Sequence, residues 1–169
     1  LRALLVHGHD LVGNLLLGPI ARDKFIAAPE PVCLTRAEKA AAYASLAMGA
    51  SQGEAPGSSA GGEQPKFLVH LDASTDYERL VVKFTPPRGT PFGERWHDLL
   101  HTELIALQTL AKHGFSTAKT RIVQSSQRTY LESVRFDRIG LNGKRHVVPL
   151  APIHKNFVGG SRQNWAASC

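Results

Sequence analysis

Residues 57–66 read GSSAGGEQPK and stand directly before a strand-like run, Phe67 to Leu71. Glycine has no Cβ, so it accepts positive φ angles and lets the backbone approach a ligand closely. Two serines and successive backbone N–H groups in such a loop can point at phosphate oxygens. The same composition is also typical of a flexible surface linker. Composition alone favours the linker and leaves the phosphate-covering loop open.

A β-hairpin is predicted immediately after this stretch. Lys66 to Leu71 and Arg79 to Phe84 are strand-like runs, and the residues between them, 72–78, are rich in Asp, Ser and Thr. Two such runs joined by a short polar turn favour an antiparallel pair. The three prolines within 85–93 exclude helix and central strand from that segment, because proline lacks a backbone donor.

The strongest helix signal covers Arg95 to His113, where Gly114 ends the pattern. Its apolar residues recur at steps of three and four, as one face of a helix requires: Leu99, Leu100, Leu104, Leu107, Leu110 and Ala111. Glu103 falls on or beside this apolar stripe. Because burial of an unpaired carboxylate is costly, Glu103 is expected to have a partner.

The other segments give shorter signals. Thr35 and Glu38 have the spacing of a capping box, which predicts a helix over Ala37 to Met48 that ends at Gly49. Prolines make 19–31 an irregular segment. Further strands are predicted at Thr120 to Val123, Arg128 to Phe136 and, after an Asn142-Gly143 turn, Lys144 to Leu150. The predicted fold class is α+β, a mostly antiparallel sheet with the 95–113 helix packed on it.

Composition excludes several classes of protein. The 169 residues carry a net charge of +6, yet the basic residues are dispersed, which argues against a nucleic-acid footprint. No apolar run approaches the roughly 18–20 residues of a membrane span. Cys33 and Cys169 lie far apart and form no metal or disulfide motif, so a reducing, cytoplasmic setting is expected. The run from His7 to Asp10 is better explained as a polar turn than as a metal site.

The order of the predicted elements suggests nucleotide chemistry. A Gly-rich loop is followed by a strand lysine, Lys83, and then by a helix glutamate, Glu103. In protein kinases a strand lysine holds the phosphates and a helix glutamate fixes the ammonium group. Alone, Lys83 could be a solubilising edge residue and Glu103 a surface residue. Together they favour a kinase N-lobe, whereas the absence of a GxxxxGK[ST] motif disfavours a P-loop NTPase.

The sequence resembles the HipA-like serine/threonine kinases of bacterial toxin–antitoxin systems, in particular the branch in which a DNA-binding segment precedes the kinase. The segments that carry the resemblance are GHDLVGNL at 8–15, SSAGGEQPK at 58–66, VKF at 82–84, TE at 102–103 and RFDR at 135–138. They occur in the order found in that family.

The resemblance implies a role for each matching residue. The ATP-phosphate loop would be formed by Ser59, Ala60, Gly61, Gly62, Glu63 and Gln64, and Ser58 falls where the family carries a serine that can be autophosphorylated. Lys83 would contact the phosphates and Glu103 would brace it. Val134, Arg135 and Phe136 would form the hinge at adenine. The family usually has Glu directly before RFDR, whereas this chain has Val134 there and Glu132 two residues earlier.

The resemblance also implies a fragment. Residues 1–50 would be part of an N-terminal subdomain and 51–169 an ATP-binding N-lobe. The catalytic Asp and Asn and the Mg²⁺-binding Asp would belong to a C-lobe expected after Trp165, so the chain alone is expected to be inactive. His154 and Asn156 are interpreted as structural. The alternative is a non-catalytic nucleotide- or partner-binding remnant, and a third hypothesis is nucleic-acid binding.

The implied cofactors are ATP and Mg²⁺. The implied partners are ATP and a protein substrate, and family members include kinases of aminoacyl-tRNA synthetases. DNA would be reached only through a segment absent here or through an antitoxin, and no membrane contact is expected.

Overall fold

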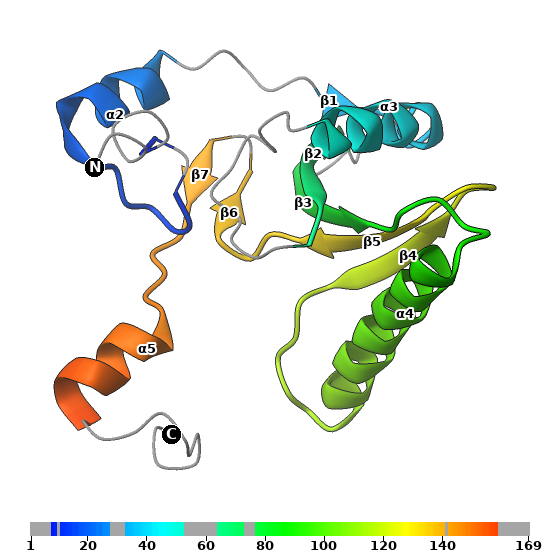
Figure 1. The fold of residues 1–169 in the computed structure, drawn as a ribbon. Helices are drawn as coiled ribbons and strands as arrows, with labels where there is room; N and C mark the ends of the chain where they lie inside the picture. The colour runs from blue at the N-terminus through cyan, green and yellow to red at the C-terminus, as the bar shows by residue number, and fades with distance from the viewer. Residues whose placement is uncertain are drawn as a thin grey trace.

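The computed structural model describes residues 8–9, 11–27, 33–52, 64–72, 77–140 and 142–158. Five strands form one sheet in the order β1-β2-β3-β5-β4, as Figure 1 shows. Their bounds are β1 Cys33–Leu34, β2 Lys66–Asp72, β3 Tyr77–Phe84, β4 Thr120–Gln124 and β5 Thr129–Val134. The longer helices are α2 Gly18–Ile26, α3 Lys39–Ser51 and α4 Pro91–Lys112.

The sheet confirms the α+β class but is mixed rather than purely antiparallel. β2 and β3 form the predicted hairpin, in which Lys66 lies opposite Lys83. β3 also pairs with β5, and β4 with β5, both antiparallel. The short strand β1 is parallel to β2. This pairing joins two distant segments, so no local sequence pattern indicated it.

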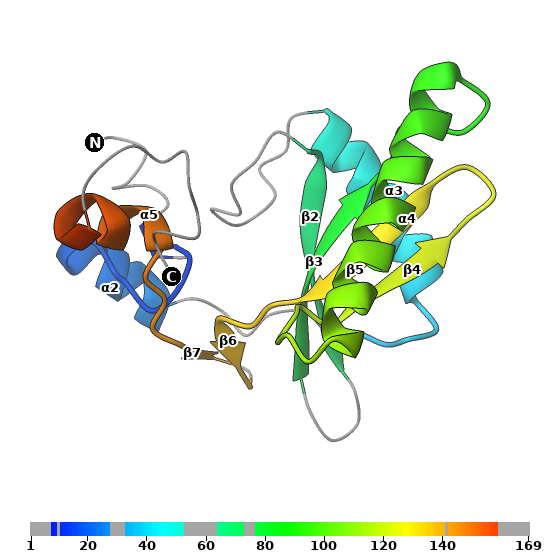
Figure 2. The same cartoon turned by 90° about the horizontal axis from the view of Figure 1, so that it is seen from below.

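Helices α3 and α4 cover opposite faces of the sheet (Figure 2). Tyr43 and Ala47 of α3 are fully buried against the face that carries the main apolar cluster. The strand members of that cluster are Phe67, Val69 and Leu71 of β2, Leu80, Val82 and Phe84 of β3, and Tyr130 of β5. Because side chains alternate along a strand, Val81 and Lys83 project from the other face, where α4 lies.

α4 begins earlier than the sequence predicted. Thr90 caps it, since its hydroxyl oxygen accepts a hydrogen bond from the Gly93 backbone N–H at 3.0 Å. The prediction that 85–93 contains no helix was therefore wrong for residues 91–93. Pro91 occupies the first turn of the helix, where its missing N–H has no hydrogen bond to lose. Leu100 is fully buried on this helix, whereas the predicted stripe residues Leu99 and Leu110 are about half exposed.

Two other predictions are corrected. The segment predicted to be irregular, 19–31, contains the helix α2 over Gly18–Ile26, in which proline again occupies the first turn. The helix predicted to end at Gly49 continues to Ser51, so this glycine lies inside α3. The capping box did form: Thr35 N–H donates to Glu38 Oε2 at 2.9 Å, and Glu38 N–H to Thr35 Oγ1 at 3.4 Å.

A smaller unit follows the sheet. Strands β6 (Arg138–Ile139) and β7 (Gly143–Lys144) form a two-stranded hairpin around the predicted Asn142-Gly143 turn. The second arm is far shorter than the predicted 144–150 strand, and Leu150 instead begins α5, Leu150–Ile153, which leads into a π-helical turn over His154–Val158. None of the helices in the described ranges is both long and apolar enough to span a membrane.

Candidate functional site

Lys83 and Glu103 form an ion pair between β3 and α4. The Lys83 Nζ lies 2.6 and 2.7 Å from the two carboxylate oxygens of Glu103, so the contact is bidentate. The side chains are 27% and 34% exposed, which keeps both groups accessible from solvent. Glu103, which was expected to have a partner because it lies beside the apolar stripe, is therefore paired with Lys83, 20 residues earlier in the sequence.

Lys66 adds a second ammonium group beside this pair. It lies directly opposite Lys83 in the β2–β3 register and on the same face of the sheet. Only 7% of Lys66 is exposed. Burial, and then the positive charge of Lys83, lower the pKa of Lys66. Lys66 was not among the predicted site residues, although its place opposite Lys83 in the predicted hairpin could have indicated it.

Most of the Gly/Ser stretch lies outside the described residues. This applies to Ser58, Ser59, Ala60, Gly61, Gly62 and Glu63, whose predicted roles stay predictions. Gln64 is described and directly precedes β2 through Pro65. The Phe84 backbone N–H donates to the Pro65 carbonyl at 3.3 Å, so the end of the stretch is fixed beside the residue after Lys83.

The predicted hinge continues from the end of β5. The Val134 N–H donates to the Lys119 carbonyl at 2.9 Å, and the Arg135 N–H to the Arg79 carbonyl at 2.8 Å. The N–H groups of Val134 and Arg135 are therefore both engaged in hydrogen bonds at the sheet. Phe136 follows in a turn with 67% of its surface exposed.

Two motifs that the sequence separates widely meet at Asp137. Arg135 donates to both carboxylate oxygens of Asp137, at 2.9 and 2.8 Å, and Arg138 donates to Oδ2 at 2.5 Å. The Gly13 backbone N–H donates to the same Oδ2 at 3.1 Å across 124 residues. Gly13 has φ of +77°, and an added Cβ would meet Val147 N at 3.1 Å, so this position requires glycine.

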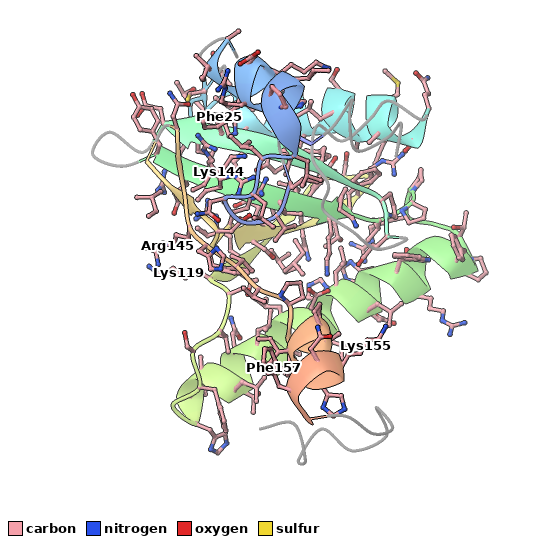
Figure 3. All side chains as sticks on the ribbon, turned by 90° about the vertical axis from the view of Figure 1, so that its left-hand side faces the viewer. Phe25, Lys119, Lys144, Arg145, Lys155 and Phe157 are labelled. Carbon is pink, nitrogen blue, oxygen red and sulfur yellow. The ribbon has the colours of Figure 1, made fainter. Side chains whose placement is uncertain are left out.

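Further contacts extend this junction along the 8–15 segment. Arg138 donates to the Leu11 carbonyl at 3.1 Å, and the Lys144 ammonium to the His9 carbonyl at 2.7 Å. Lys144 also lies over the Phe25 ring of α2, 4.7 Å from its centroid (Figure 3). RFDR and GHDLVGNL, quoted above as separate pieces, thus form one polar junction that holds the N-terminal segment against the hinge.

The electrostatics of the junction favour ionised Asp137. Burial alone would raise the pKa of this carboxyl. The Arg135 hydrogen bonds, the Gly13 N–H and the two guanidinium charges outweigh burial and lower the pKa to about 2. Asp137 is thus a buried anion that is paired with Arg135 and Arg138 and accepts a hydrogen bond from Gly13, as a stable buried charge requires.

Glu132, two residues before the position where the family usually has glutamate, lies on the α3 face of the sheet. Its side chain is 1% exposed and faces α3, on the opposite side of the sheet from Lys83. Tyr43 Oη donates to its Oε1 at 2.7 Å, and Lys39 Nζ and Arg121 Nε form ion pairs with it. Burial and the Glu132 carboxylate raise the pKa of the Tyr43 hydroxyl. Glu132 therefore ties α3 to the sheet and does not reach the hinge.

The described residues contain no group of three or more His, Cys, Asp or Glu side chains that could hold a metal ion. The predicted polar turn at 7–10 falls partly outside the described residues, which include only Gly8 and His9 of it. Asn156, interpreted as structural, donates within its own turn to the Pro152 carbonyl at 2.9 Å.

Comparison with known proteins gives two matches. The family model described as "HipA-like C-terminal domain" matches residues 58–155. "Toxin YjjJ" of Escherichia coli (strain K12) is 36% identical over 159 residues, which are 94% of this chain and 36% of that protein. The chain thus spans about a third of the length of this relative. No solved structure gives a significant match.

The family match covers Lys83, Glu103, the hinge residues and RFDR in one continuous range, and it includes the Gly/Ser stretch from Ser58 onward. Of the segments that carry the resemblance, only 8–15 lies outside this range, and the structure brings Lys83 to Glu103 and RFDR to the 8–15 segment. The chain therefore belongs to the HipA-like family.

Proposed function

We propose that the chain is the nucleotide-binding lobe of an ATP-dependent serine/threonine protein kinase. The observation that supports it most is the bidentate Lys83–Glu103 contact between a sheet strand and the helix packed on it. In kinases this pair holds the lysine where the α- and β-phosphates bind. The pair is partly exposed, so a ligand can reach the ammonium group without opening the core.

Lys66 strengthens the proposal. Two ammonium groups on neighbouring strands repel each other, and this repulsion adds to burial, the larger cause, in lowering the pKa of Lys66. An anionic ligand at this face would relieve that repulsion. ATP phosphates beneath a loop formed by Ser59, Ala60, Gly61, Gly62, Glu63 and Gln64 would lie next to both lysines, because the loop leads directly into β2. Ser58 would be its regulatory phosphorylation site.

The hinge can be assigned more finely than the resemblance allowed. Since the N–H groups of Val134 and Arg135 are engaged by the sheet, Phe136 is the residue whose N–H would donate to adenine. The exposed Phe136 ring would lie against the base. The substitution of Val134 for glutamate would then leave these backbone contacts intact. Mg²⁺ would bind with ATP, and no described cluster is assigned to it.

The name of the relative supports a proposal about the biological role. "Toxin YjjJ" is named a toxin, and we propose that the complete protein acts as a bacterial toxin kinase on a protein substrate. An aminoacyl-tRNA synthetase is one candidate, and an antitoxin is the proposed binding partner. A second candidate is a nucleotide- or partner-binding remnant without phosphotransfer.

Calorimetric titration with ATP and Mg²⁺ tests nucleotide binding. Lys83→Ala should weaken binding at least about tenfold, because it removes a charge contact to the phosphates. Lys112→Ala, a matched change at the exposed end of α4, should leave affinity unchanged. Equal affinities for the three proteins would contradict the proposed site. Incubation of this chain with radiolabelled ATP and casein should give no phosphorylation, and ordinary kinase turnover would contradict the expectation that the catalytic residues lie outside it.

A further inference from the structure

Two histidines lie one turn apart on α4, beside the turn that joins β4 to β5. His97 and His101 are four residues apart, a spacing that places both side chains on one face of a helix. The centroids of their rings are 4.2 Å apart. Both residues are half-buried, so water and small ions can reach the rings.

Each ring is held through its Nδ1 atom. His101 Nδ1 donates to the His97 carbonyl at 2.9 Å, because a carbonyl oxygen can only accept. His97 Nδ1 lies 2.6 Å from the hydroxyl oxygen of Thr129, a fully buried residue at the start of β5. A histidine that binds a metal ion through one ring nitrogen usually has the other nitrogen fixed by a protein oxygen in this way.

The two Nε2 atoms are therefore the atoms that can bind a ligand. With the proton on Nδ1, the lone pair of His101 is on Nε2. Gln124, at the end of β4, faces this atom with 3.4 Å between the two nitrogens, which is longer than the usual 2.7–3.2 Å of a hydrogen bond to nitrogen or oxygen. The tautomer of His97 that donates to Thr129 likewise leaves a lone pair on Nε2.

The charged side chains around the pair favour a cation. Arg88, Glu94 and Asp98 are the charged side chains, other than the two histidines, that act on His97. Arg88 is paired with Glu94 at 3.4 Å, so these two charges offset each other. The carboxylate of Asp98, the residue after His97, remains as a negative charge beside the ring.

We propose that His97 and His101 bind one divalent transition-metal ion of the zinc type through their Nε2 atoms, with water in the remaining coordination positions. Imidazole nitrogen is a preferred ligand of such ions. Zn–N bonds of 2.0–2.1 Å require about 3.3 Å between the two nitrogens, a separation that rings with centroids 4.2 Å apart can reach. Two protein ligands make a weak, exchangeable site, which is compatible with the absence of any larger ligand group among the described residues.

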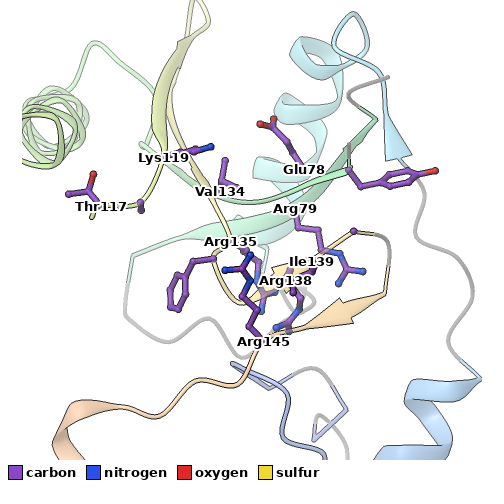
Figure 4. A pocket seen from close by; sticks show the side chains of 13 residues that line it. Glu78, Arg79, Thr117, Lys119, Val134, Arg135, Arg138, Ile139 and Arg145 are labelled. Atoms are coloured by element: carbon purple, nitrogen blue, oxygen red, sulfur yellow. The ribbon is translucent and has the colours of Figure 1, made fainter. Parts of the chain in front are cut away.

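This metal site is distinct from the proposed nucleotide site. His101 and Glu103 are two residues apart on α4, so their side chains point in nearly opposite directions around the helix axis. α4, all of which the structure describes, contributes no residue to the pocket beside the hinge, where Val134 and Arg135 lie (Figure 4). The two sites share only the helix that carries Glu103.

Titration calorimetry with ZnCl₂ at neutral pH, without chelator or nucleotide, tests the proposal. His97→Gln and His101→Gln should each weaken Zn²⁺ binding at least about tenfold, because loss of a ligand should cost at least as much as loss of a residue that only orients one. His113→Gln is the matched control, since His113 is exposed at the end of the same helix. Circular dichroism spectra identical to wild type would show that the variants are folded.

Nuclear magnetic resonance of the ring nitrogens identifies the ligands directly. Zn²⁺ should shift the Nε2 signals of His97 and His101 and leave those of His113 unchanged. Lys83→Ala should bind Zn²⁺ as wild type does, so failure of the nucleotide site and failure of the metal site are distinguishable. Absence of Zn²⁺ binding, equal affinities for all variants, or a loss with only one of the two substitutions would overturn the proposed site.

Discussion

Replacing Glu132 by Gln tests how strongly the buried charge cluster holds α3 to the sheet. The side chain is 1% exposed and accepts a hydrogen bond from Tyr43 while it pairs with Lys39 and Arg121. Glutamine has nearly the same shape and can still accept from Tyr43. The substitution therefore removes one negative charge from between two cations and leaves the packing almost unchanged.

The magnitude follows from the exposure of the partners. Breaking a buried ion pair by removing one member costs roughly 3–5 kcal/mol. Here Arg121 is 38% exposed and keeps its contact with Glu78, while Lys39 is 15% exposed. Both cations can recover part of their hydration. We therefore expect a decrease of about 2–3 kcal/mol in the free energy of unfolding, which is below the usual cost of a fully buried pair.

Urea denaturation followed by circular dichroism measures this decrease. Glu94→Gln is the matched control, because it makes the same chemical change in an ion pair with Arg88 in which both side chains are 39–47% exposed. Exposed pairs contribute about 0–1 kcal/mol. A Glu132→Gln decrease no larger than that of Glu94→Gln would refute the view that the cluster fixes α3.

Three further changes have defined outcomes. Asp137→Asn should destabilise the fold at neutral pH, and the difference in stability from wild type should shrink as the pH falls from about 4 towards 2. The reason is that a carboxyl whose pKa is lowered in the folded state stabilises the fold above its unfolded pKa and loses this contribution on protonation. Urea midpoints across this pH range measure the effect, and a constant difference would contradict it. Gly13→Ala should lower thermal stability more than Gly18→Ala, since both have positive φ but only Gly13 has a neighbour within 4 Å of the added Cβ; equal melting temperatures would argue against the junction with Val147. Thr90→Ala should lower the free energy of unfolding by about 1 kcal/mol, because the cap of α4 is lost. Thr109→Ala should lower it less, because the Thr109 hydroxyl only donates to the Ile105 carbonyl in the same helix. A denaturant midpoint for Thr90→Ala no lower than that for Thr109→Ala would contradict the importance of the cap.

Local signals predicted the central hairpin and the long helix well. Lys66 to Leu71 and Arg79 to Phe84 carry strand residues over their full length, and the turn between them is short, so β2 and β3 are placed within two residues at their ends. The Thr35–Glu38 capping box is equally local, and its hydrogen bonds formed. Proline misled where it occupied the first turn of a helix, at Pro19 and Pro91, because there it has no N–H partner to lose.

The contacts that local patterns could not predict join distant parts of the chain. No residue near Asp137 in the sequence indicates that the Gly13 N–H donates to its carboxylate. Glu132 lies on the buried face of β5, where the alternation of a strand predicts an apolar residue. Lys66 was quoted within a motif but entered the site only when its register with Lys83 was known.

The proposed function depends most directly on whether Lys83 recognises phosphate rather than base. Affinities for ATP and for adenosine, measured by calorimetry on wild type and Lys83→Ala, isolate this contribution because the two ligands share the base and the ribose. We predict that wild type binds ATP at least about tenfold more tightly than adenosine, and that Lys83→Ala loses most of this advantage while its adenosine affinity is unchanged. An ATP advantage of the same size in both proteins would contradict the proposal that the Lys83–Glu103 pair is a phosphate site.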